Sequence, residues 1–209
     1  MLTIISANVA GYDVPKRHVP QAAKVEWLNI GDPLFATQRT PRMQAKLPKL
    51  FPWEFSYFWH QQDACSVWLD ASYEIVSPDF AEMVLDTLST TDLALFRHPH
   101  RDCIYEEAKV SKDIPKYADE PIQEQADHYQ AAGHPEHWGL WECGFIARRH
   151  TEQIRDLSED WWNEINRWSI QDQLSFPVVC RRAGIRPTEF EGTRWDNPWL
   201  VWHDHLRND

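Results

Sequence analysis

Acidic side chains follow three short apolar runs of this chain, a position from which a carboxylate can reach a ligand. Asp13, Asp32 and Asp70 each come just after such a run. An ionised carboxylate that is buried without a partner is strongly destabilising, so Asp70, which follows "SVWL", must either close a turn or face a ligand. Carboxylate oxygens are the ligands that Mg²⁺ and Mn²⁺ prefer. We therefore expect Asp70 to bind a divalent cation or to cap a turn or helix.

The densest polar segment of the chain reads "FRHPHRDCIYEEA". Its Arg97, His98 and Arg101 offer guanidinium and imidazole donors for a phosphate or a carboxylate. The alternative is a solvated loop whose charges pair with one another.

Two further acids stand where predicted elements begin. Glu142 precedes a strand, and Gly144 beside it either allows the close approach of a ligand or another backbone or marks a simple bend. Asp172 and Gln173 open a helical stretch. Because a helix N-terminus carries partial positive charge, an acid is favoured there on structural grounds alone. Asp172 is therefore interpreted as a helix cap or as a catalytic acid.

Two histidines near the end of the sequence, His203 and His205, are separated by one residue. Residues at this spacing point the same way on a strand, so both could face one metal ion, or both could simply be exposed. The sequence has only seven glycines and contains no glycine-rich phosphate-binding motif. Side chains and a metal would therefore have to bind any phosphate.

The overall composition excludes several classes of protein. The net charge of −11 argues against nucleic acid as a general electrostatic partner. No stretch approaches the about 20 apolar residues that a membrane span needs, and the N-terminus lacks the pattern of a signal peptide. The four cysteines show no Cys-x-x-Cys spacing and are interpreted as reduced thiols. We expect a cytoplasmic protein without a membrane partner.

Short apolar strands alternate with helical stretches along the 209 residues, which we interpret as one domain over 1–209. This alternation predicts an α/β sandwich with a mostly parallel sheet, whose ligand lies beyond the carboxyl ends of the strands. Acids at those ends would then meet at one edge. The predicted strands are residues 2–7, 24–30, 66–70, 92–96 and 143–149, and the predicted helices begin at 77–78 and cover 115–132, 151–168 and 172–183.

Several segments occur in an order that resembles a known family. "LFPWEFSYFWHQQDACSVWLDASYEI", "ALFRHPHRDCIYEEA", "HWGLWECGFIARRHT", "DWWNEI" and "DQLSF" follow one another within residues 4–180. They resemble the glycosyltransferase-like family formerly catalogued as domain of unknown function 616, whose plant members include the TOD and MUCI-type proteins. The resemblance implies a GT-A type, Rossmann-like three-layer sandwich with a mixed, mostly parallel sheet. It also implies transfer of a sugar from a nucleoside diphosphate sugar to an acceptor hydroxyl.

The outline is also similar to glycosyltransferase family 8, and that similarity implies roles for residues of this chain. Asp70 matches the first acid of an Asp-x-Asp metal motif, and His203 or His205 would be the late histidine that completes a Mn²⁺ or Mg²⁺ site. Asp172 and Gln173 would lie beside the donor sugar. We expect the other candidates to complete the site: Glu142 would orient the acceptor hydroxyl, Tyr12 and Asp13 would hold the nucleoside by stacking and hydrogen bonds, and Arg97, His98 or Arg101 would help to neutralise the diphosphate. Asp32 and Gly144 are expected to contact the donor.

Two departures from these patterns bear on the chemistry. Ser72 stands where family 8 has its second Asp, which weakens the metal site, and Gln171 stands where many relatives carry Arg. By analogy with family 8 the reaction retains the configuration at the sugar carbon. The same acids are compatible with two other functions: a metal-dependent nucleotide phosphohydrolase, or a non-catalytic module that binds sugar nucleotides. The acceptor is open as well, a modified nucleobase included.

Overall fold

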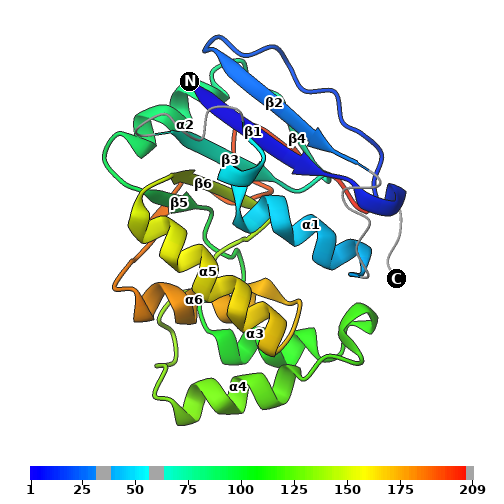
Figure 1. Cartoon of the computed structure of the whole chain (residues 1–209), viewed down its shortest axis with the longest axis vertical. Helices are drawn as coiled ribbons and strands as arrows, with labels where there is room; N and C mark the ends of the chain where they lie inside the picture. The colour runs from blue at the N-terminus through cyan, green and yellow to red at the C-terminus, as the bar shows by residue number, and fades with distance from the viewer. Residues whose placement is uncertain (32–38, 57–63, 206–209) are drawn as a thin grey trace.

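The computed structural model describes residues 1–31, 39–56 and 64–205, and these form an α/β sandwich around a mixed sheet (Figure 1). The strand order is β2-β1-β3-β6-β5-β7, and all strands are parallel except β6. The predicted fold class, a three-layer sandwich with a mostly parallel sheet, is confirmed, and the arrangement is consistent with a Rossmann-like GT-A fold. The strands of this sheet are β1 (Leu2–Ala7), β2 (Val25–Ile30), β3 (Cys65–Leu69), β5 (Leu93–Leu95), β6 (Phe145–Arg149) and β7 (Thr188–Glu189).

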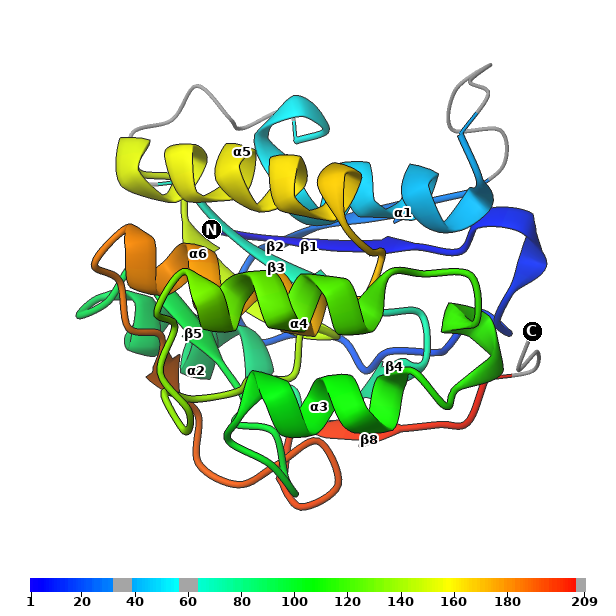
Figure 2. The same ribbon diagram turned by 90° about the horizontal axis from the view of Figure 1, so that it is seen from below.

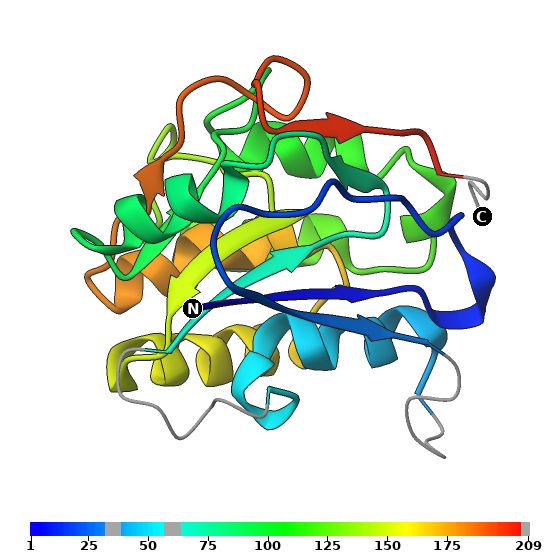
Figure 3. The same ribbon diagram turned by 90° about the horizontal axis from the view of Figure 1, so that it is seen from above.

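Helices cover both faces of the sheet (Figures 2 and 3). One face carries α1 and α5, with α6 packed against α5. The other face carries α2 and a small antiparallel sheet of β4 and β8. A third group, α3 and α4, packs beside α6. The bounds are α1 (Pro41–Leu50), α2 (Phe80–Leu88), α3 (Ile104–Ser111), α4 (Ile122–Ala131), α5 (Glu152–Arg167), α6 (Asp172–Arg182), β4 (Tyr73–Ile75) and β8 (Leu200–Trp202).

The alternation of side chains along the central strands explains why the sheet is covered twice. In β3, Val67 and Leu69 enter the core beneath α2, whereas Trp68 enters the core beneath α1 and α5. Successive residues of a strand point to opposite faces, so an unbroken apolar run is buried on both sides. Short apolar strands of this kind are typical of a sheet with helices on each face.

Several boundaries differ from the sequence prediction for physical reasons. The expected helix over 115–132 is broken into a short 3-10 turn (Pro115–Tyr117) and α4, because Pro121 disfavours helical backbone in the residue before it. The helix expected from Ser77–Pro78 begins at Phe80. Helix α1 was not predicted, because Pro48 lies inside it.

Candidate functional site

A cavity of about 820 Å³ opens at the carboxyl ends of β1 and β3. The antiparallel strand β6 begins at this same edge, so the turn that precedes it also lines the cavity. The expected meeting of strand-end acids is confirmed for Asp13 and Asp70. Asp32 lies outside the described residues. Of the other predicted site residues, Tyr12, Glu142, Gly144, Asp172, Gln173 and His205 line the cavity as well.

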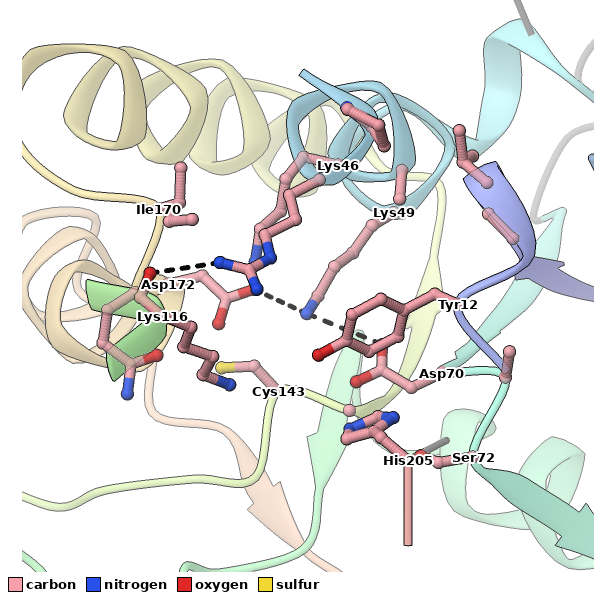
Figure 4. A pocket seen from close by; sticks show the side chains of 18 of the residues that line it. Tyr12, Lys46, Lys49, Asp70, Ser72, Lys116, Cys143, Ile170, Asp172 and His205 are labelled. Atoms are coloured by element: carbon pink, nitrogen blue, oxygen red, sulfur yellow. Dashed lines mark hydrogen bonds and ion pairs between the residues drawn. The ribbon is translucent and has the colours of Figure 1, made fainter. Parts of the chain in front are cut away.

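A lysine of α1 links the two acids on which the prediction depended most (Figure 4). The ammonium of Lys49 lies 2.5 Å from Oδ2 of Asp172 and 4.0 Å from Oδ1 of Asp70. The ammonium of Lys46 donates to the same oxygen of Asp172. Asp70 and Asp172 thus belong to one charged network, although they are far apart in the sequence.

Burial makes this network electrostatically strong. Lys49 and Asp172 are both buried. Burial by itself would raise the pKa of Asp172, but the two lysine ammoniums lower it below its usual range. Burial by itself would lower the pKa of Lys49, but Asp172 and Asp70 raise it above its usual value. Asp172 is therefore held as a carboxylate and Lys49 as an ammonium at neutral pH.

Local structure explains how α1 presents these lysines. Thr40 caps the helix by accepting a hydrogen bond from the Met43 amide at 3.3 Å. Lys46 and Lys49 are three residues apart and therefore lie on one face of the helix. At its other end, the buried guanidinium of Arg148 donates to the Lys49 carbonyl at 2.7 Å, which fixes the last turn.

Asp70 itself is held by its neighbours in the turn after β3. The Trp68 indole N–H donates to Oδ1 of Asp70 at 2.6 Å. A Cβ added to Gly144 would lie 2.9 Å from Oδ2 of Asp70 and 2.9 Å from Cε2 of Tyr73. Gly144 is thus needed for the close approach of these two side chains, and contact of Gly144 with a ligand stays a prediction.

Glu142 also lines the cavity and is buried. The Arg194 guanidinium donates to its Oε2 at 3.2 Å, whereas its Oε1 has no hydrogen-bond partner among the described residues. Burial raises the pKa of Glu142 to about 7, although Arg194 acts in the opposite direction. A carboxyl group with this pKa can take up or release a proton near neutral pH.

The basic segment predicted to bind phosphate, residues 97–101, does not line the cavity. His98 is buried, with Nε2 3.6 Å from Oε1 of Glu142. Arg101 forms an ion pair with the buried Glu107 at 2.7 Å. Arg97 is exposed. The segment instead supplies partners to buried acids, so the interpretation of local ion pairs describes it better than phosphate binding.

Both ends of the chain contribute to the cavity rim, and the two late histidines separate there. Nδ1 of His205 lies 3.0 Å from Oδ2 of Asp13. The ring of Tyr12 packs edge-on against the imidazole of His205. His203 does not line the cavity; its Nε2 lies 3.0 Å from a carboxylate oxygen of Glu74.

The predicted ligand set for Mn²⁺ or Mg²⁺ does not come together among the described residues. Only one group of three or more His, Cys, Asp or Glu residues there has its ligand atoms all within 4.8 Å of one another, and it consists of Asp102, Glu106 and His137. These three residues are exposed and do not line the cavity. Asp70 already accepts a hydrogen bond from Trp68 and has the Lys49 ammonium nearby. The surroundings of Asp70 therefore do not fit the predicted centre of Asp70, His203 and His205. Binding of Mn²⁺ or Mg²⁺ stays a prediction.

Two glutamines at the start of α6, Gln171 and Gln173, line the cavity. Gln173 donates to the Trp141 carbonyl at 3.2 Å. Gln171 is buried, donates to Glu107 at 3.0 Å and accepts from the Tyr117 hydroxyl at 3.1 Å. The neutral side chain of Gln171 therefore ties α6 to α3.

A family model describes most of the chain. The TOD1/MUCI70, glycosyltransferase-like domain matches residues 32–191. The chain belongs to this family. No curated protein and no solved structure matches the chain. In the parts that the structure describes, no helix is long and apolar enough to cross a membrane.

The basic residues of the cavity were not predicted from the sequence of this TOD1/MUCI70 member. Those that line it are Arg42, Lys46, Lys49, Lys116 and Arg194. The three-residue spacing of Lys46 and Lys49 in "QAKLPKL" is compatible with one face of a helix, but Pro48 between them argued against a helix there. Arg194 lies outside the matched range, as do Tyr12, Asp13 and His205, so both flanks of the family domain help to build the site.

Proposed function

We propose that this TOD1/MUCI70 member transfers a sugar from a nucleoside diphosphate sugar to an acceptor hydroxyl. Membership of a glycosyltransferase-like family supports a transferase of this general type. The observation that carries the proposal is the convergence of Asp70 and Asp172, through Lys49, on a large cavity at the strand ends. In α/β sheets this edge is where ligands bind.

The cavity offers a distinct group for each part of the reactants. Tyr12 and Asp13 lie together at one rim, where an aromatic face and a carboxylate suit the base and ribose of a nucleoside. Gln173 and Asp172 lie at the start of α6 and would hold the donor sugar. Glu142 also lines the cavity, next to the Trp141 carbonyl that Gln173 binds, and would hold the acceptor hydroxyl.

The proposed reaction exchanges one bond to the sugar for another. The bond from the anomeric carbon to the diphosphate oxygen breaks, and its electron pair stays on the diphosphate. A bond forms from the acceptor oxygen to the same carbon, and the acceptor proton passes to the Glu142 carboxylate. A preorganised charged site favours this step because it stabilises the charge that develops on the leaving group.

Other features of the proposal go beyond the family assignment. Retention of configuration, a cytoplasmic location and a role for Mn²⁺ or Mg²⁺ stay predictions. The donor sugar, its nucleotide and the acceptor remain to be identified by assay.

Acceptor-dependent release of nucleoside diphosphate from a panel of UDP- and GDP-sugars tests the proposal. We expect release that requires an acceptor, and we expect Asp70→Asn to lower it at least about 100-fold, because the carboxylate that helps to hold the Lys49 ammonium in the cavity is lost. Because Asp70 is 38% exposed, the melting temperature of this variant should change by only a few degrees. The matched control is Asp160→Asn, an exposed acid of α5 outside the cavity.

Two results would contradict the proposal. Release of free phosphate without an acceptor would indicate a phosphohydrolase. Nucleotide binding with no turnover for any donor would indicate a binding module.

A further inference from the structure

We propose that a cluster of three lysines, Lys46, Lys49 and Lys116, binds the diphosphate of the donor and supplies the positive charge that the leaving group needs without a divalent cation. This inference rests on the proposed function, because it concerns the diphosphate of the same donor. The cluster spans two elements, since Lys46 and Lys49 come from α1 and Lys116 from the turn before α4.

First, the lysine ammoniums of the cluster outnumber the carboxylates that pair with them. Lys46 and Lys49 both donate to a single oxygen, Oδ2 of Asp172. Asp70 lies 4.0 Å from Lys49, so two carboxylates serve these two ammoniums. Lys116 has no carboxylate within ion-pair distance among the residues that the structure describes. The cluster of three lysines and two acids thus has one ammonium in excess.

The second argument is the position of that extra ammonium. Lys116 lines the same cavity as Lys46 and Lys49, and Figure 4 shows its side chain on the Asp172 side of that cavity. Its backbone is fixed, because the Arg42 guanidinium donates to the Lys116 carbonyl at 3.1 Å. Lys116 is half-buried, and a cation withdrawn from water in this way favours an anionic partner.

The remaining acids of the cavity do not neutralise Lys116. Glu120 accepts a hydrogen bond from the Ile170 amide, and Asp119 is exposed. Glu142 is paired with Arg194. Burial and the neighbouring Lys46 ammonium lower the pKa of Lys116, and the carboxylates of Asp172 and Asp70 offset this only in part. The negative charge of a bound diphosphate would raise the pKa of Lys116 and stabilise its ammonium form.

The third argument concerns the other groups that could bind a diphosphate. The sequence has no glycine-rich loop that would bind phosphate through backbone amides. In the part of the chain that the structure describes, the predicted metal ligands do not meet in the cavity. A lysine ammonium is a compact cation with three donors and is an established phosphate ligand. Arg42 and Arg194 also line the cavity, but Arg42 donates to the Lys116 carbonyl and Arg194 is paired with Glu142. The three lysines are therefore the concentration of positive charge best placed to meet a diphosphate.

Calorimetric titration tests the inference independently of turnover. The probes are UDP, GDP and inorganic pyrophosphate, each titrated in EDTA and again with MnCl₂. We expect at least one nucleoside diphosphate to bind in EDTA, with an affinity that MnCl₂ changes by less than about threefold. Lys116→Met, which removes the charge and leaves no acid unpaired, should weaken binding about tenfold or more, in line with the loss of a charge-assisted hydrogen bond.

Two further variants make the result specific. Lys46→Met should also weaken binding about tenfold, while Lys49 remains to pair with Asp172. Lys112→Met is the matched control, since Lys112 is exposed, lies four residues before Lys116 and does not line the cavity. It should bind within about twofold of the unaltered chain. Melting temperatures of all variants show that a weaker titration does not reflect unfolding.

The outcomes separate this inference from the function on which it rests. Binding that appears only with MnCl₂, or that Lys116→Met leaves unchanged, overturns the lysine cluster and leaves the transferase proposal standing. Failure of UDP, GDP and pyrophosphate to bind under both conditions overturns the lysine cluster together with a diphosphate donor. Binding in EDTA without any sugar transfer supports the lysine cluster and contradicts the transferase.

Discussion

Glu142 shows how one residue can be tuned by its surroundings. It is buried, one of its oxygens is paired with Arg194, and the other has no hydrogen-bond partner in the described parts of the chain. Its pKa of about 7 results mainly from burial, which disfavours the charged form. The nearby imidazole of His98 does little to offset this, because burial lowers the pKa of His98 to about 3 and keeps it neutral.

The pH dependence of transfer follows from this pKa. If the Glu142 carboxylate takes the acceptor proton, kcat/KM should rise as the pH increases through about 7 and level off above it, because only the deprotonated form is active. Glu142→Gln should lower transfer at least about 100-fold and remove this dependence. The measurement is kcat/KM as a function of pH on both sides of this pKa. A flat profile, or an active Glu142→Gln variant, would show that Glu142 only positions the acceptor.

At the scale of elements, the site depends on how closely the start of β6 approaches the end of β3. The Asp70 amide donates to the Gly144 carbonyl at 2.8 Å, so the two turns are directly bonded. Only a residue without a Cβ leaves room there for the side chains of Asp70 and Tyr73. The geometry of Asp70 is thus determined by an element remote in sequence.

Gly144→Ala tests this dependence. The added methyl group would lie 2.9 Å from Asp70 and from Tyr73, so one of them must move, and we expect a loss of about 1–3 kcal/mol in the free energy of unfolding. Transfer should fall further than stability explains, because Asp70 is displaced. Chemical denaturation and the transferase assay measure the two effects. Gly31→Ala is the control, since nothing lies within 4 Å of its added Cβ; equal behaviour of the two variants would contradict the account.

The elements with strong local signals were predictable from sequence, and those with conflicting signals were not. Helix α5 was predicted from its apolar stripe and from Thr151, which caps it by accepting from the Ile154 amide. Helix α1 was missed because Pro48 lies inside it. The short pair β4 and β8 was missed because each strand has three residues and their pairing joins distant segments.

At the scale of the whole molecule, the cavity joins segments from the entire chain. The family domain over 32–191 supplies Asp70, Glu142 and Asp172, whereas the flanking segments supply the pair of Asp13 and His205. Strand-end acids were predictable because parallel strands end at one edge. The lysines of the cavity were not, since their roles depend on how α1 and the turn before α4 pack over that edge.

A crystal structure of the chain with UDP or GDP, soaked without added metal, tests most directly whether this cavity is the donor site. The account predicts the diphosphate inside the cavity, in ion-pair contact with Lys116 and Lys46, and the nucleoside beside Tyr12 and Asp13. A nucleotide bound elsewhere on the molecule, with Asp70 and Asp172 untouched, would contradict it.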